Sequence, residues 1–138
     1  MDIKPKVLIV DDEPEFAELL EFNLRKQGCE TIRAENGIQA LRMARAEMPD
    51  VILLDIMLPD LDGLSVCDIL QSQPSTRGLP VFMVSALGEN YARGRSSRAK
   101  FELYFSKPVD LALLGSSVRR AARARQESVA ATMRDREQ

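Results

Sequence analysis

The sequence contains no histidine and no tryptophan, and only two cysteines, Cys29 and Cys67, among its 138 residues. Without histidine, a zinc site built on histidine, a Ser-His catalytic pair and a histidine general base are all excluded. The two cysteines lie far apart and not at the spacing of metal ligands. We therefore expect two small buried thiols in a reduced, cytoplasmic protein.

Long apolar runs and a strong net charge are also missing. No run approaches the roughly 20 apolar residues of a membrane helix, and the N-terminal six residues lack the apolar region of a signal peptide. We expect no membrane partner. The formal net charge is only −2, which gives no bulk attraction to nucleic acid. Arginines do gather between residues 93 and 100, where we interpret them as a solvated face.

What the sequence does contain is a regular alternation of apolar runs and helical patterns. Strands are expected over 6–10, 30–34, 51–55, 79–84 and 101–105. Helices are expected from Pro14 to Gly28, from Asn36 to Met48, around 64–70 and from Asp110 onward, with a short or irregular one within 88–100. Asn36 and Asp110 are the expected N-terminal caps of their helices. This order predicts an α/β fold, a doubly wound (βα)5 parallel sheet with helices on both faces.

The length predicts one domain over residues 1–125. Residues 126–138 are expected to be a helical extension or a disordered tail, because the last helix has no proline and, after Gly115, no glycine. A stalk toward an output domain and a frayed end both fit that pattern.

Three of the expected strands end at charged residues. Asp11-Asp12 follow the first strand, Asp55 ends the third, and Lys107 follows the fifth. Parallel strands bring their carboxyl ends to one edge of the sheet, where open α/β folds bind ligands. Carboxylates suit Mg²⁺, which takes oxygen ligands, and a lysine can neutralise a phosphoryl oxygen. Asp55 is then a plausible nucleophile that would form an acyl phosphate, with Asp11 and Asp12 at the metal.

These residues resemble those of the receiver domains of two-component response regulators, over essentially the whole chain. The resemblance adds the segment from Leu54 to Gly63 around Asp55, Ser85-Ala86, Tyr104 and Lys107-Pro108. It implies the flavodoxin-like strand order 2-1-3-4-5 and a cis Lys107–Pro108 bond. It also implies that the backbone carbonyl of Met57 joins the Mg²⁺ ligands, that Ser85 bonds a phosphoryl oxygen, and that Tyr104 turns inward as a switch.

The resemblance further implies a function and its partners. A sensor histidine kinase or a phosphotransfer protein would phosphorylate Asp55, and the activity would be limited to accepting and losing that group. The face formed by the fourth helix, fifth strand and fifth helix would signal to a downstream partner, with a homodimer as a further option and no direct contact with nucleic acid. Two alternatives remain: a phosphate-independent interaction module, and a hydrolytic phosphatase with an aspartyl nucleophile.

Two departures from the family pattern stand out. The segment Lys100-Phe101-Glu102 replaces the usual Gly-Ala-Asp before the fifth strand, which favours a distinctive output surface. Met57 and Leu87 place apolar side chains at the rim of the expected pocket. Because apolar groups hinder an in-line water, we hypothesise slow self-dephosphorylation.

Overall fold

The computed structural model describes residues 3–95 and 100–137 and contains five strands that alternate with five helices. The strands are β1 (Lys6–Val10), β2 (Glu30–Ala34), β3 (Val51–Leu54), β4 (Val81–Ser85) and β5 (Leu103–Ser106). The helices are α1 (Pro14–Lys26), α2 (Gly37–Glu47), α3 (Gly63–Ser72), α4 (Glu89–Arg95) and α5 (Leu111–Arg136).

The strands form one parallel sheet in the order β2-β1-β3-β4-β5, which confirms the predicted topology. The chain crosses over between β2 and β3, so β1 and β3 become neighbours. Val10 of β1 is paired with Leu54 of β3 at the end of both strands. The next residues, Asp11 and Asp55, therefore leave the sheet side by side.

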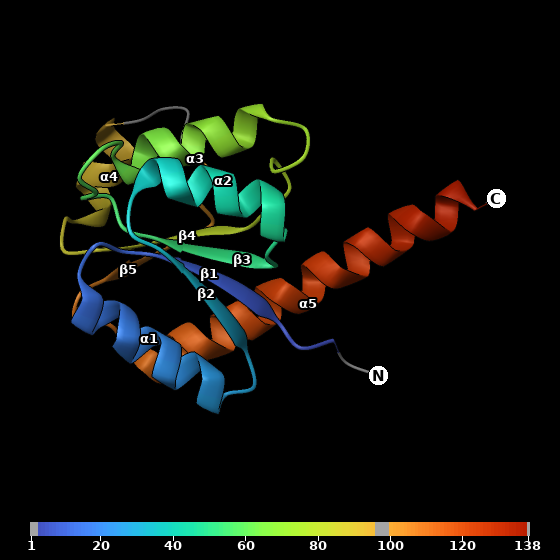
Figure 1. Cartoon of the computed structure of the whole chain (residues 1–138), viewed down its shortest axis with the longest axis horizontal. Helices are drawn as coiled ribbons and strands as arrows, with labels where there is room; N and C mark the ends of the chain where they lie inside the picture. Colours follow the sequence, from blue (N-terminus) through green and yellow to red (C-terminus); the bar gives the residue numbers. More distant parts are fainter. Residues whose placement is uncertain (1–2, 96–99, 138) are drawn as a thin grey trace.

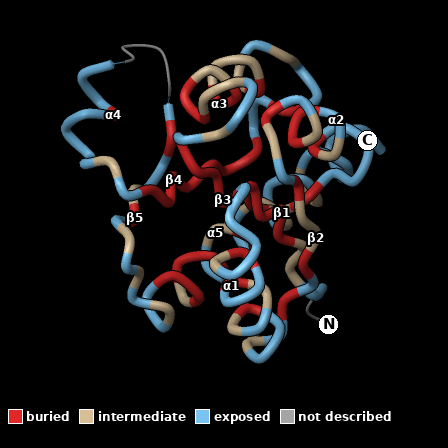
Figure 2. Tube along the Cα trace, turned by 60° about the vertical axis from the view of Figure 1, so that its left-hand side comes forward, coloured by how far each residue is buried: buried red, intermediate tan, exposed pale blue. Residues whose placement is uncertain are grey.

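The helices cover both faces of the sheet, with α2 and α3 on one side and α1 and α5 on the other (Figure 1). Neighbouring strand residues point to opposite faces, as the twofold period of a strand requires. Leu8 and Ile52 join the buried cluster under α2 and α3, whereas Ile9 and Leu53 join the cluster under α1 and α5. Figure 2 shows the resulting buried centre along β1, β3 and β4.

Side chains cap three of the helices at their N-termini. Asn36 accepts a hydrogen bond from the amide of Gln39 in α2, and Asp110 does the same for Leu113 in α5. Both caps follow the sequence prediction, because a short side-chain oxygen satisfies an amide of the first turn that has no helical partner. Asp62 caps α3 in the same manner.

Some strand bounds differ from the prediction, which followed apolar runs. β4 begins at Val81 and β5 at Leu103, each two residues later than expected. Pro80 has no amide hydrogen to donate to a neighbouring strand. Phe101 is buried, but it lies before the first β4–β5 pair, Phe82 with Leu103. The helix expected within 88–100 is a short one, α4, and residues 96–99 of that segment lie outside the described residues.

Helix α5 continues well past the body of the domain (Figure 1). The side-chain Nε2 of Gln126 donates to Asp50 Oδ2 at 3.2 Å and to the carbonyl of Ile3 at 3.3 Å, which ties α5 to the base of the sheet. From 127 to 137 the described residues are exposed or half-buried. In the described part of the chain, no helix is both long and apolar enough to cross a membrane.

Candidate functional site

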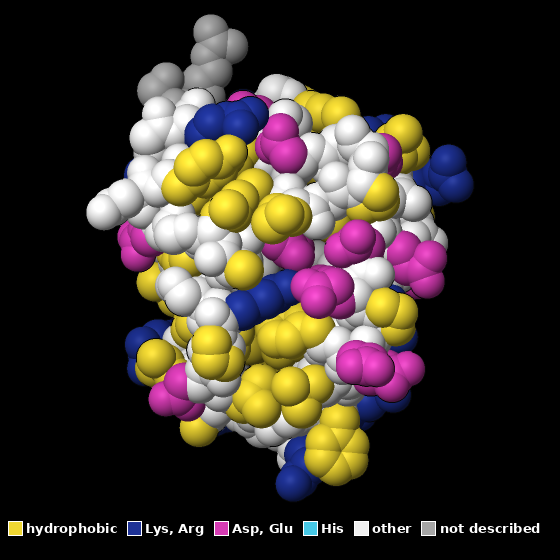
Figure 3. Space-filling model, turned by 90° about the vertical axis from the view of Figure 1, so that its left-hand side faces the viewer, with side chains coloured by type: hydrophobic (Ala, Val, Ile, Leu, Met, Phe, Trp, Pro, Cys, Tyr) yellow, Lys and Arg dark blue, Asp and Glu magenta, His cyan; other side chains and the backbone are white. Residues whose placement is uncertain are grey.

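The candidate site lies at the carboxyl edge of the sheet, where β1, β3 and β5 end. This edge faces the viewer in Figure 3, where acidic side chains lie above and to the right of a central basic one, with hydrophobic side chains above and below the group. Asp11 and Asp12 follow β1, Asp55 follows β3, and Lys107 follows β5. The topology thus brings together residues that are up to 96 positions apart in the sequence.

Lys107 is the centre of the charge network. Its Nζ lies 2.9 Å from Asp11 Oδ2, 3.0 Å from Glu13 Oε1 and 3.1 Å from Asp55 Oδ2. The ammonium group also lies 4.3 Å from the centre of the Phe16 ring, a cation–π contact that supports its position. The peptide bond between Lys107 and Pro108 is cis, as the family resemblance implied.

Burial and charge set the protonation of this network. Burial alone would lower the pKa of Lys107, but hydrogen bonds to Asp11 and Glu13 and the charge of Asp55 outweigh it, and its pKa is raised. Lys107 is therefore a fixed positive charge at any physiological pH. Burial raises the pKa of Asp11, against the opposing effect of its hydrogen bond with Lys107. The charge of Lys107 therefore offsets only part of the cost of burying the ionised Asp11 carboxylate, and a bound cation would offset more of it.

Three carboxylates converge in a way that suits a metal ion. One oxygen each from Asp11, Asp12 and Asp55 lies within 4.8 Å of the others. Asp11 and Asp55 are buried, whereas Asp12 is exposed and reaches the site from its open side. Oxygen donors on a solvent-facing edge fit a hard cation that keeps some of its waters, as Mg²⁺ does. The donor set therefore fits the predicted metal.

The backbone holds Asp55 firmly beneath this opening. Its amide donates to the carbonyl of Val10 at 3.0 Å, and its Oδ1 accepts from the amide of Met57 at 3.2 Å. The side chain is 4% exposed. A carboxylate held in this way needs little rearrangement before it attacks a phosphorus atom placed over its outer oxygen.

Ser85 and Tyr104 lie next to each other on the β4–β5 side of the site. Ser85 is fully buried and its Oγ accepts from the amide of Leu87 at 3.3 Å. The Tyr104 hydroxyl donates to the carbonyl of Ser85 at 3.4 Å, and that carbonyl also accepts from the amide of Lys107 at 3.0 Å. Burial raises the pKa of Tyr104, so its hydroxyl stays a donor. Ser85 thus connects Lys107 with Tyr104.

A shallow groove runs from Asp12 across the apolar rim of the site. Met57 and Leu87 line it as the sequence suggested, and Tyr91 and Arg95 of α4 complete it. Arg95 bonds the Tyr91 hydroxyl at 2.7 Å and lies 3.9 Å from Asp62 Oδ2. The α4 residues were missed by the sequence analysis, because that segment shows little helical pattern.

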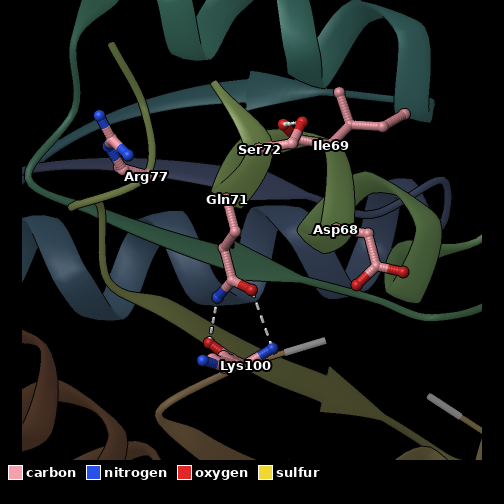
Figure 4. Close-up of a pocket in the computed structure, with 6 residues that line it drawn as sticks. All are labelled: Asp68, Ile69, Gln71, Ser72, Arg77 and Lys100. Atoms are coloured by element: carbon pink, nitrogen blue, oxygen red, sulfur yellow. Dashed lines mark hydrogen bonds between the residues drawn. The ribbon is translucent and has the colours of Figure 1, made fainter. Parts of the chain in front are cut away.

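A separate pocket lies beside α3 (Figure 4) and includes none of the predicted site residues. Two hydrogen bonds join the Gln71 side chain to the backbone of Lys100 in this pocket. Gln71 Oε1 accepts from the amide of Lys100 at 3.0 Å, and Gln71 Nε2 donates to the Lys100 carbonyl. Cys67, whose pKa burial raises to about 12, is buried in the same helix. We interpret this pocket as the packing of α3 on the start of the β5 segment.

The structure brings the predicted site residues to one edge of the sheet. Two contributors were missed: Glu13, which pairs with Lys107, and Phe16, whose ring lies under it. Their signal was present in the sequence, because Glu13 directly follows Asp12 and Phe16 lies one turn into α1.

The fold and the charged edge together define a class, the flavodoxin-like α/β domains with an acidic pocket at the carboxyl edge of the sheet. Residues 7–119 match the model of the response regulator receiver domain family. The chain therefore belongs to that family, and the predicted resemblance is confirmed.

Individual relatives agree with this assignment. The chain is 39% identical over 103 residues to the alkaline phosphatase synthesis transcriptional regulatory protein PhoP of Bacillus subtilis, covering 75% of this chain and 42% of PhoP. It spans less than half the length of the first curated relatives that it matches.

Solved structures give the same picture. The receiver domain of the Francisella response regulator 1452 has a TM-score of 0.80 and 30% identity, covering 88% of this chain and 98% of that one. The receiver domain of the sensor histidine kinase PA1611 from Pseudomonas aeruginosa PAO1, with a magnesium ion coordinated in its active-site cleft, has the same score and identity. That match covers 87% of this chain and 98% of the other.

Proposed function

We propose that this receiver domain is a Mg²⁺-dependent phosphoryl acceptor in a phosphorelay, with Asp55 as the phosphorylated residue. The observation that carries the proposal is the position of Lys107, whose Nζ contacts Asp55 Oδ2 at 3.1 Å beside the carboxylates of Asp11 and Asp12. A nucleophile, a fixed cation and a set of metal ligands lie together, which is what phosphoryl transfer requires of a protein.

The reaction uses few protein groups. A carboxylate oxygen of Asp55 attacks the phosphorus of a phosphohistidine, the P–N bond breaks, and the imidazole keeps the electron pair and takes a proton. The product is an acyl phosphate, which water later hydrolyses. Lys107 binds a phosphoryl oxygen as a point charge, and Ser85 offers its hydroxyl to another.

Mg²⁺ would be held by Asp11, Asp12, Asp55 and the backbone carbonyl of Met57, and it supplies positive charge for the phosphoryl oxygens. Support comes from the convergence of the carboxylates and from the related PA1611 receiver domain, which has magnesium in its cleft. The donor would be a sensor histidine kinase or a phosphotransfer protein, and a cytoplasmic location belongs to the same proposal.

Signalling would pass through Ser85 and Tyr104 to α4, β5 and α5. A phosphoryl group adds charge and strong acceptors next to the buried Ser85 hydroxyl. When Ser85 moves toward it, the carbonyl to which Tyr104 is bonded moves as well, which changes the surface that a partner contacts. The hydrolytic phosphatase is disfavoured, because β1 is followed by Asp-Asp-Glu, without the second aspartate expected two residues after a nucleophile.

Acetyl phosphate tests this function directly. We expect the wild-type protein with acetyl phosphate and Mg²⁺ to gain one phosphoryl adduct by intact mass, and Asp55→Asn or added EDTA to abolish it. An unmodified wild-type protein would instead support the phosphate-independent interaction module. Steady release of phosphate from a stable phosphomonoester would support the phosphatase.

A further inference from the structure

The loop between β3 and α3, residues 55–62, carries both Asp55 and the carbonyl of Met57. The loop folds back on itself, because the carbonyl of Ile56 accepts from the amides of Leu58 at 3.1 Å and Gly63 at 2.8 Å. These bonds fix the shape of the loop, and the Asp55 amide ties its first residue to the carbonyl of Val10 in β1 at 3.0 Å. The far end of the loop, from Leu58 to Asp62, takes its position from other contacts.

Asp60 ties this loop to another element. Its Oδ1 accepts from the amide of Gly37 at 2.7 Å and its Oδ2 from the amide of Ile38 at 3.0 Å. Both amides belong to the first turn of α2, so one exposed side chain satisfies two donors that have no helical partner. The same bonds, that from Ile38 first, lower the pKa of Asp60, which keeps the carboxylate ionised.

The packing around this contact is close. A Cβ at Gly37 would lie 2.9 Å from both Leu61 Cβ and Val66 Cγ2, so the start of α2 presses against the loop and α3. Helix α2 is in turn fixed by its own cap, Asn36, and by buried residues under the sheet. Asp60 therefore fastens the far end of the loop to α2.

We propose that Asp60 is a positioning residue for the metal site, which holds the β3–α3 loop so that the Met57 carbonyl faces the carboxylates that follow β1. The inference rests on the function proposed above. Mg²⁺ accepts little departure from octahedral geometry, so a shift of one ligand weakens binding. The side-chain bonds of Asp60 go to α2, and Asp60 is not one of the proposed ligands, so the chemistry of Asp55 at saturating Mg²⁺ should not depend on it.

The matched control is Asn36, which caps the same helix end but does not contact the β3–α3 loop through its cap bond. Asp60→Ala and Asn36→Ala each remove a cap from α2, and we expect similar losses in Tm. By calorimetric titration, Asp60→Ala should raise the Kd for Mg²⁺ by about ten-fold, the usual cost of removing a residue that orients a ligand. Asn36→Ala should bind as the wild type does. Adduct formation at Asp55 under saturating Mg²⁺ should be the same in all three.

A second measurement needs no metal. In Mg²⁺-free protein, Asp60→Ala should speed amide hydrogen exchange at Met57 and Leu58, and Asn36→Ala should not. Equal Mg²⁺ affinities in the two variants, or equal exchange at these amides, would overturn the inference. A wild-type protein that binds no Mg²⁺ would refute the proposed metal site instead, and the exchange comparison would still decide whether Asp60 holds the loop.

Discussion

At the scale of single residues, the site combines buried charge with an apolar rim. Lys107 pairs with three carboxylates, those of Asp11, Glu13 and Asp55, which outnumber it. This imbalance is unfavourable for folding, and it is useful for binding a cation and a phosphoryl group. On the open side, Met57 exposes 58% of its surface. A water that approaches from this side would meet a thioether, which is only a weak hydrogen-bond acceptor.

The lifetime of the acyl phosphate should depend on Met57. An asparagine there can bond and orient water in line with the P–O bond, so Met57→Asn is expected to speed loss of phosphate several-fold. A time course of intact mass after removal of acetyl phosphate measures this rate. Met48→Asn is the control, because Met48 is also exposed but lies at the far end of α2. An unchanged lifetime in Met57→Asn would contradict the role of the apolar rim.

At the scale of elements, the sequence predicted the five strands, the five helices, with α4 as a short one, and the caps Asn36 and Asp110, because apolar periodicity and capping chemistry are local. It predicted strand ends less well. Phe101 and Leu79 are buried apolar residues that lie just before β5 and β4, outside the paired residues of the sheet. Burial explains their apolar character, whereas strand pairing depends on partner strands far away in the sequence. For the same reason the role of Asp60 was not visible: its partners are more than twenty residues earlier in the chain.

Helix α3 begins against the backbone of the candidate phosphorylation site. A Cβ at Gly63 would lie 2.1 Å from the carbonyl oxygen of Asp55, a contact with backbone that cannot move aside. We expect Gly63→Ala to lower the free energy of unfolding by about 3 kcal/mol, the upper part of the usual range for overpacking. Urea unfolding followed by circular dichroism measures the change.

Gly94→Ala serves as the comparison for Gly63→Ala. Gly94 lies in α4, where an added Cβ meets nothing within 4 Å. Alanine is favoured over glycine inside a helix by roughly 0.5–1 kcal/mol, so this variant should be as stable as the wild type or slightly more stable. If both variants unfolded at the wild-type urea midpoint, the close approach of α3 to Asp55 would not constrain the fold.

At the scale of the whole molecule, the carboxyl edge of the sheet collects the site, and α5 extends from the other end of the domain (Figure 1). The position of the site followed from the sequence, because parallel strands must end at a common edge. The sequence left the length of α5 open between a helical extension and a disordered tail, since its second half lacks the apolar stripe that packing against a sheet would impose. The structure shows the helical extension, to Arg136. Arg125 interrupts the pattern between Ala122 and Val129.

The extension of α5 should be dispensable for folding and too poor in apolar residues to pair with a second copy. Between 127 and 137 the exposed large apolar side chains are Val129 and Met133, whereas a stable coiled coil needs apolar positions over three or four heptads. A chain cut after Gln126 keeps the bonds of that residue to Ile3 and Asp50. It should lose helical circular dichroism signal and keep its urea midpoint. Gel filtration with light scattering should give the same oligomeric state for the full-length and the shortened chain. If only the full-length chain formed a dimer, the extension would be a dimerising stalk.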